Sequence, residues 1–154
     1  MPDRIVTPRL VLEPVTAEVA CAVLAGKGPA AARGWPGPDA LQAFRFAAEL
    51  GGDPGWIIMR DGLVLGECGT HGPPDLDGTV EIRYGIAPSQ QGEGFGTEAC
   101  TALTAWLLAQ GGVVRVAAST HAAGNPASRR VLEKSGFVLE RVEDPMAWYV
   151  RRSD

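Results

Sequence analysis

A glycine-rich run between residues 91 and 97 is the part of this sequence best suited to chemistry. Gly92, Gly94 and Gly96 occupy alternate positions, so the main chain there carries few side chains. Bare backbone lets several N–H groups converge on one anion, and a helix that begins at the same place adds the positive end of its dipole. The run follows a strand-like segment and opens a long helical pattern. It therefore predicts a site for a phosphorylated ligand.

The spacing of these glycines excludes two common phosphate motifs. A dinucleotide fingerprint needs G-x-G-x-x-G and an acidic residue about twenty positions later, whereas here every second residue is glycine. The ATP-binding loop G-x-x-x-x-G-K-[ST] needs a lysine, and none follows Gly96. The alternative interpretation of the run is a flexible turn in front of a helix.

A second polar cluster lies where another helix is expected to begin. Asn125 is a favourable N-cap, and Pro126 suits the first helical position. Asn125 and Ser128 are three residues apart, so they share one face of that helix. Each also has a plainer interpretation, because Asn125 could only cap the helix and Ser128 could be an ordinary first-turn serine. The two clusters together favour a ligand site over a flexible turn.

The composition restricts the class of protein. A chain of 154 residues suits a single domain spanning 1–154, and 45% hydrophobic content is ordinary for a globular protein. A net charge of -4 argues against nucleic-acid binding, so an anionic ligand would be held by local amides. Three cysteines without metal-like spacing predict reduced thiols in a cytoplasmic protein and no metal site. We expect no signal peptide and no membrane span, since no apolar run approaches about 20 residues.

Hydrophobic periodicity predicts strands that alternate with helices. The expected strands are 9–14, 56–60, 63–69, 79–86, 113–118, 137–142 and 146–151. The expected helices are 17–25 with Thr16 as N-cap, 39–50, a long one after the glycines, and one from Pro126 to Ser135. This order predicts an α/β layered fold. The central strand, glycine turn, helix and strand should form a right-handed crossover between parallel strands.

The strand at 79–86 divides its side chains between two faces. Alternation puts the apolar and aromatic residues on one face, namely Val80, Ile82, Tyr84 and Ile86. Glu81, Arg83 and Gly85 share the other face, which is polar. A carboxylate is therefore expected to point away from the core near the end of the strand that precedes the glycine turn.

These motifs together resemble the GNAT N-acetyltransferase superfamily. Gln91 to Gly96 looks like its Q/R-x-x-G-x-G/A acetyl-CoA signature. Thr97-Glu98-Ala99 and the run from Asn125 to Phe137 are similar to the branch of ribosomal-protein N-terminal acetyltransferases. Thr7 to Leu12 resembles the opening strand of that branch, and Gly34-Trp35-Pro36 resembles a loop found in part of it. The resemblance spans nearly the whole chain in the right order.

The resemblance implies a fold, a cofactor and a set of binding residues. The fold would be α/β (α+β), with a mixed, mostly antiparallel, splayed sheet flanked by helices and acetyl-CoA between the two central strands. An amine would be the acceptor, namely a peptide N-terminus or a small molecule, and the protein would be a monomer or homodimer. The cofactor-binding residues implied by the family are Ile86, Ala87, Gln91, Gly92, Glu93, Gly94, Phe95, Gly96, Thr97, Asn125 and Ser128.

Acetyl transfer to an amine needs a base, an oxyanion donor and stabilisation of the leaving thiolate. Glu81 is the candidate base, acting directly or through water, although it could equally be a solvated or Arg83-paired carboxylate. Ser128 is the candidate partner for the sulfur of coenzyme A, because its hydroxyl can donate a hydrogen bond. Many other branches use a tyrosine in this neighbourhood, and none is apparent here. His71 and His121 are weaker candidates for the base, because each lies in a loop, although the ordinary pKa of histidine is close to neutral pH.

Two other classes of function stay open at this point. One is a non-catalytic sensor of acetyl-CoA or coenzyme A with the same fold, and the other is a protein that binds nucleotides through adenine phosphates. The sequence does not identify the acceptor amine. We expect its site to be built by the loops 26–39 and 71–78, with Trp35 as a candidate lining residue and Trp56 more suited to the core.

Overall fold

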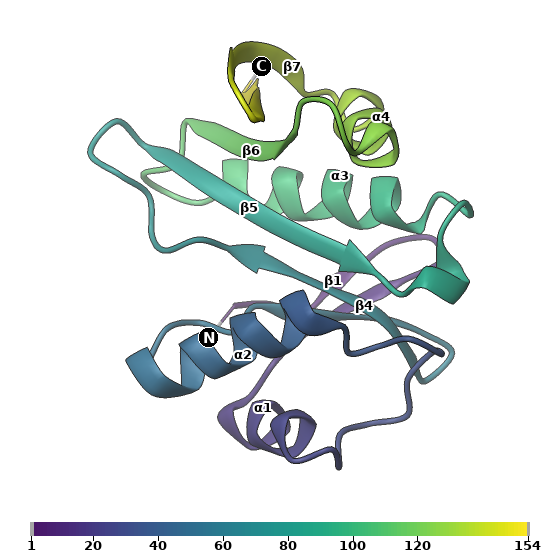
Figure 1. Cartoon of the computed structure of the whole chain (residues 1–154). Coiled ribbons are helices and arrows are strands. Elements are labelled where there is room, and N and C mark those ends of the chain that lie inside the picture. The colour runs from purple at the N-terminus through teal and green to yellow at the C-terminus, as the bar shows by residue number, and fades with distance from the viewer. Residues whose placement is uncertain (1, 154) are drawn as a thin grey trace.

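The computed structural model describes residues 2–153 and has one mixed, mostly antiparallel sheet (Figure 1). Its eight strands lie side by side in the order β1-β2-β3-β4-β5-β6-β8-β7. The strands are Ile5–Val6 (β1), Val11–Pro14 (β2), Trp56–Arg60 (β3), Leu63–Thr70 (β4), Thr79–Ile86 (β5), Arg115–His121 (β6), Val138–Glu143 (β7) and Met146–Arg152 (β8). The α-helices are Ala17–Leu24 (α1), Pro38–Leu50 (α2), Phe95–Leu108 (α3) and Pro126–Lys134 (α4).

Local sequence signals explain where several of these elements begin and end. The Thr16 side chain accepts a hydrogen bond from the N–H of Val19 and so caps α1. Gly51 ends α2 in the left-handed conformation, with φ 71°. Asp61 and Gly62 both have positive φ, and they join β3 to β4 in a tight hairpin. These three signals were read correctly from the sequence.

Strands β5 and β6 form the one parallel pair of neighbouring strands that the described residues contain. They pair at three positions, of which the last joins Glu81 to Ala117. Beyond this position β5 continues to Ile86 and β6 continues to His121, but the two strands no longer pair with each other. Figure 1 shows the two strands diverging toward their C-terminal ends. The sheet is therefore split between its two central strands, as predicted.

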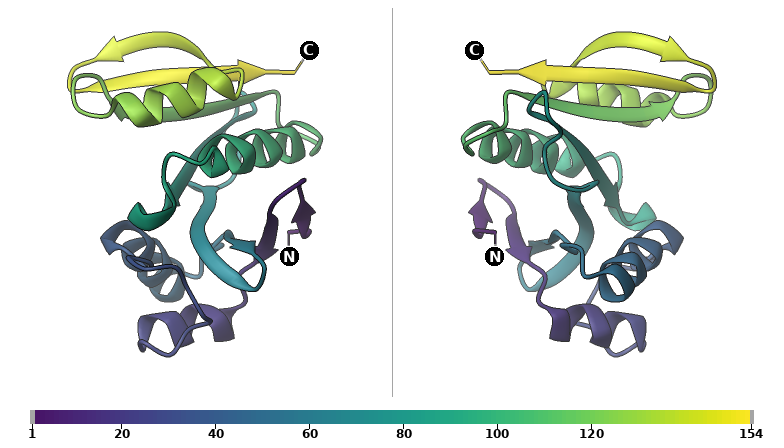
Figure 2. Two further views of the ribbon diagram at one scale, coloured as in Figure 1. Left: turned by 90° about the vertical axis from the view of Figure 1, so that its right-hand side faces the viewer. Right: turned by 90° about the vertical axis from the view of Figure 1, so that its left-hand side faces the viewer.

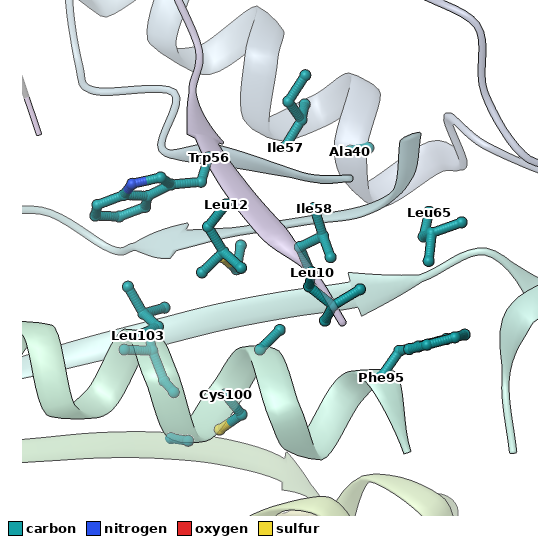
Figure 3. Close-up of a cluster of buried hydrophobic side chains, with 14 of the residues drawn as sticks. Leu10, Leu12, Ala40, Trp56, Ile57, Ile58, Leu65, Phe95, Cys100 and Leu103 are labelled. Carbon is teal, nitrogen blue, oxygen red and sulfur yellow. The ribbon is translucent and has the colours of Figure 1, made fainter. Parts of the chain in front are cut away.

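Helix α3 connects the two diverging strands and packs against the sheet. Its fully buried Leu103 and Phe95 belong to one apolar cluster with Leu10 and Leu12 of the N-terminal segment (Figure 3). Helices α1 and α2 lie at one end of the molecule, and α4 lies at the other with β6, β7 and β8 (Figure 2). The core thus holds the start of the chain against the middle of it.

The structure differs from the sequence-based elements at three points. The short strand β1 was not predicted, and β2 begins at Val11 rather than Arg9. Strand β6 covers Arg115–His121 rather than 113–118. The N–H groups of Val114 and Arg115 both donate to the carbonyl of Gly78, which fixes the first sheet pairing at Arg115. Val113 is buried although it lies outside the strand. Its apolar character therefore suggested a strand that began two residues too early.

Two further expectations concern the chain as a whole. None of the helices within residues 2–153 combines the length and apolarity that crossing a bilayer requires. Cys21, Cys68 and Cys100 carry free thiols, of which only Cys21 is exposed. No group of three or more metal-ligating side chains occurs in the described part of the chain.

Candidate active site

The glycine run forms an exposed turn between a short 3-10 helix, Pro88–Gln90 (η1), and helix α3. Gly92 and Gly94 have φ values of 85° and 82°, which favour glycine, and Gly94 is the N-cap residue of α3. Within residues 2–153, none of the main-chain N–H groups from 92 to 97 donates a hydrogen bond. The first bond of the helix runs from Glu98 to Gly94. The turn therefore offers a set of free amides at the positive end of a helix dipole.

Arg9 holds this turn in place from the N-terminal segment. One guanidinium nitrogen donates to the carbonyl of Glu93 at 2.9 Å, and another donates to the Glu98 carboxylate at 2.7 Å. The Glu98 carboxylate also accepts from the main-chain N–H of Arg9 and from the hydroxyl of Thr7. The guanidinium lies 4.5 Å from the centre of the Phe95 ring. The sequence placed Arg9 in an opening strand but gave no sign of this contact.

A cavity of about 230 Å³ lies where β5 and β6 diverge. Strand β5 contributes Ile82, Arg83 and Tyr84 to its wall. The rest of the wall comes from β6, the start of α4 and nearby loops, namely Ala118, Ser119, Thr120, His121, Asn125, Ser128, Met146 and His71. Side chains do not fill the split, so an extended ligand can lie along the unpaired edge of β5.

Asn125 and Ser128, two residues that the sequence singled out, both lie in this wall, and the structure adds a third residue, Tyr84. The Asn125 side chain accepts a hydrogen bond from the Ser128 N–H at 3.1 Å, so it caps α4 as well as facing the cavity. The hydroxyl groups of Ser128 and Tyr84 are 3.0 Å apart. Burial raises the pKa of Tyr84 to about 12, so its phenol stays protonated near neutral pH.

The sequence analysis missed this tyrosine. Tyr84 was assigned to the apolar face of β5, and no tyrosine was apparent near Ser128. The alternation was right, because Tyr84 does share a face with buried Ile82 and lies against the helices. The missing information was that α4 crosses this face close enough for the phenol to reach Ser128.

Glu81 occupies the closed end of the split, at the last paired position of β5 and β6. It is half-buried, and the hydroxyl of Ser119 donates to its carboxylate at 3.4 Å. It forms no ion pair with Arg83 among the described residues, so an Arg83-paired carboxylate is ruled out, while a solvated carboxylate stays the alternative to a base. Glu81 does not line this cavity, but Ser119 and Ile82 beside it do.

A second, larger cavity of about 950 Å³ lies between α2 and the strands β4 and β5. Glu67 lines it and is only 6% exposed, and its carboxylate accepts a hydrogen bond from the Trp35 indole at 2.5 Å. Burial raises the pKa of Glu67, and the bond from Trp35 and the charge of Arg83 oppose that shift only in part. The two cavities share three wall residues, namely His71, Arg83 and Tyr84.

The walls of the larger cavity differ from the two loops that the sequence pointed to for an acceptor site. Helix α2 contributes more of the wall than the loop 26–39, of which only Asp39 takes part. The other loop contributes His71, Gly72 and Pro73 as expected. Trp35 is buried and acts through Glu67 instead of lining the cavity. Trp56 is buried in the core, as predicted.

The remaining predicted residues differ in what they leave free for a ligand. The Ile86 carbonyl accepts a hydrogen bond from the Gln91 side chain at 3.0 Å. Ala87 is buried, its N–H donates to Leu65 and its carbonyl accepts from Gln90, so it has little left to offer. The ring of Phe95 is also buried, which leaves its N–H as the group that faces the turn. Gly96 and Thr97 are half-buried in the first turn of α3.

Comparison with known proteins identifies the family. The family model described as an acetyltransferase (GNAT) domain matches residues 9–138. A Bacillus subtilis (strain 168) protein named Uncharacterized N-acetyltransferase YjdG is 31% identical over 114 residues, which cover 68% of this chain and 67% of that protein. The chain therefore belongs to the GNAT acetyltransferase family.

Solved structures agree with this assignment at the level of the fold. A GNAT-family acetyltransferase from Bacillus anthracis is similar with a TM-score of 0.72 at 16% identity, covering 97% of this chain and 98% of that one. RimJ from Mycobacterium smegmatis, in complex with CoA-disulfide, has a TM-score of 0.72 at 20% identity and covers 99% of this chain and 88% of that one. The structure has the GNAT fold.

The protein is thus an N-acetyltransferase whose acyl donor is acetyl-CoA. The residues present fit that donor, because a turn of free amides suits its diphosphate and an unfilled split suits its thioester arm. Family membership removes the alternative of a protein that binds nucleotides through adenine phosphates.

The contacts of Glu98 predict a pH-dependent share of stability. Partial burial raises the pKa of Glu98, but hydrogen bonds from Thr7 and Arg9 outweigh it and hold the pKa below its ordinary value. A lowered native pKa gives stability that is present above the ordinary pKa of about 4.3 and is lost as the pH falls through the native pKa. We therefore expect Glu98→Gln to lower the urea midpoint near neutral pH, with a gap to wild type that shrinks below about pH 4.

Glu133→Gln, on the exposed face of α4, is the matched control and should leave the midpoint unchanged. A Glu98→Gln protein as stable as wild type at neutral pH would contradict the prediction. So would a gap that stays constant down to acid pH.

Proposed function

We propose that this protein transfers an acetyl group from acetyl-CoA to a primary amine, either a peptide N-terminus or a small molecule, by direct attack in a ternary complex. One observation carries the proposal: the split that suits the donor and the larger cavity meet at shared wall residues. Two ligands, one in each cavity, would therefore both contact His71, Arg83 and Tyr84, which supports an amine and a thioester held close to the same residues. We further infer a cytoplasmic enzyme, because three free thiols suit a reducing compartment.

The donor would lie along the unpaired edge of β5. The amides from Gly92 to Thr97 would bind its diphosphate, and the main chain near Ile86 would pair with its pantetheine arm. Asn125 and Ser128 would flank the thioester from the start of α4. Acetyl-CoA supplies an activated acyl group, and the chain supplies position, a proton acceptor and a proton donor.

Glu81 is our candidate for the proton acceptor. In the transfer one C–N bond forms and one C–S bond breaks, while the amine gives up one proton and the sulfur takes up one. Since Glu81 lines neither cavity, we propose that it receives the proton through water beside Ser119, its hydrogen-bond partner. Glu67 is a second candidate for the proton acceptor, because burial raises its pKa and it lines the larger cavity directly.

Ser128 and Tyr84 are our candidates for the proton donor to the sulfur. The phenol of Tyr84 carries its proton at neutral pH, so it can donate to Ser128 while the Ser128 hydroxyl donates onward. The pair crosses the split from opposite sides, one residue on β5 and the other on α4. This supports a relay across the split to the leaving thiolate.

The diphosphate site predicts that Gly94→Asp abolishes measurable acetyl-CoA binding. The substitution adds bulk at a φ of 82° and a negative charge where the diphosphate would lie. Isothermal calorimetry with coenzyme A measures the effect. Gly112→Asp is the matched control, because Gly112 has a φ of 87°, open space around its Cα and a place beyond the far end of α3. Unchanged affinity in Gly94→Asp would refute this site.

The base assignment predicts that Glu81→Gln lowers kcat by about 100-fold or more while the KM for acetyl-CoA stays within about twofold. Glu67→Gln, measured in parallel, discriminates between the two candidates. If Glu67→Gln shows this loss of kcat and Glu81→Gln does not, the base is Glu67.

The relay predicts that Ser128→Ala and Tyr84→Phe slow the same step. Each should lower kcat, and the double variant should be barely slower than the slower single variant, because both changes interrupt one chain of hydrogen bonds. Steady-state rates with a saturating amine test this. Effects that multiply in the double variant would mean that the two hydroxyl groups act independently.

A further inference from the structure

The guanidinium of Arg83 is an unpaired cation at the base of the larger cavity. It lies across the bare backbone of Gly69, where an added Cβ would come within 2.9 Å of a guanidinium nitrogen. Its one hydrogen bond within residues 2–153 goes to the carbonyl of Pro54, at 2.9 Å. It forms no ion pair with any described carboxylate. Most of its five N–H donors are therefore available to a ligand in the cavity.

The acidic residues nearby do not take up this cation. Glu67 lies beside the cation, but its pKa is raised by burial and its carboxylate is already bonded to Trp35. Asp53 accepts a hydrogen bond from the N–H of Gly55 at 2.8 Å. Asp39 lines the cavity from the start of α2. An arginine remains charged at neutral pH, so the cavity combines a fixed positive charge with free donors of the geometry that a carboxylate prefers.

The wall opposite the sheet is apolar beyond Asp39 and Gln42. Helix α2 contributes Ala43, Phe46 and Ala47, and Phe46 is 63% exposed although it is a large aromatic residue. An apolar group of an acceptor would cover Phe46 and remove that surface from water. The cavity therefore suits a molecule with an anionic end and an apolar body.

The position of Arg83 on β5 links this anion site to the proposed chemistry. Arg83 lies in the wall of both cavities, and Glu81 is two residues earlier on the same face of the strand. Because Arg83 lines both cavities, a small molecule whose carboxylate binds Arg83 can direct its amine toward the split, from which a proton can reach Glu81 through water.

We propose that the acceptor is a small primary amine that carries a carboxylate and an apolar side chain, as a free amino acid does, and that Arg83 binds the carboxylate. This rests on the proposed function and narrows its acceptor class. The carboxylate takes no part in bond making: the amine nitrogen forms the new C–N bond, the C–S bond breaks, and the carboxylate stays paired with Arg83. A peptide N-terminus has an amide at that position instead of a charge.

Matched acceptors test this on the full chain. L-leucine, leucinamide and a leucine-initiated tripeptide amide are compared by following thiol release from acetyl-CoA. We expect kcat/KM for L-leucine to exceed that for leucinamide by about tenfold or more, since a charge-assisted pair contributes about that much. In Arg83→Gln the ratio of kcat/KM for L-leucine to that for leucinamide should fall to about one, and in Arg83→Lys it should be partly restored. Arg45→Gln, on the exposed face of α2, is the matched control, and its ratio should equal that of wild type.

Comparing kcat/KM for L-leucine with kcat/KM for leucinamide within each protein cancels any general loss of activity. The KM for acetyl-CoA in Arg83→Gln checks that the donor site is intact. Equal or better turnover of leucinamide or the tripeptide amide by wild type overturns the inference and leaves the proposed function standing. Absence of turnover with L-leucine and every other amino acid tried also overturns it. Failure to bind acetyl-CoA at all would count against the proposed function itself.

Discussion

The loss of pairing between β5 and β6 is the constraint on which the rest of the site depends. Three paired positions hold the two strands together at one end, and beyond Glu81 they part. An unpaired strand edge inside a sheet exposes main-chain donors and acceptors that must find partners elsewhere. Here the opening stays lined by side chains such as Tyr84 and Ser128 without being filled by them. A ligand with its own amide groups is therefore the natural partner for that edge.

The helices divide the work on the two sides of this opening. Helix α3 supplies free amides at its start, and α4 supplies Asn125 and Ser128 at its own start. Helix α2 covers the other side and forms one wall of the larger cavity. Arg83 and Tyr84 are neighbours on β5 and both line the two cavities, so one strand could contact both ligands at once.

Much of this could be predicted from the sequence, because the signals were local. Helix caps such as Thr16 and Asn125, the Asp61-Gly62 hairpin and the glycine turn each depend on a few adjacent residues. The residues that were missed act over long sequence separations. Tyr84 reaches Ser128, and Glu67 is held by Trp35, through contacts that only the packing of helices on the sheet creates. The β6 boundary failed for a similar reason, since burial of Val113 does not require sheet pairing.

The contact between Arg9 and the carbonyl of Glu93 joins the start of the chain to the glycine turn across more than half of the sequence. A glycine-rich turn gains much conformational entropy when it becomes disordered, so the contact with Arg9 helps to fix its shape. Anchoring of the N-terminal segment and occupancy of the turn are then thermodynamically linked, and each strengthens the other. The N-terminal segment is synthesised before the turn, so a ligand that binds the turn would stabilise both at once.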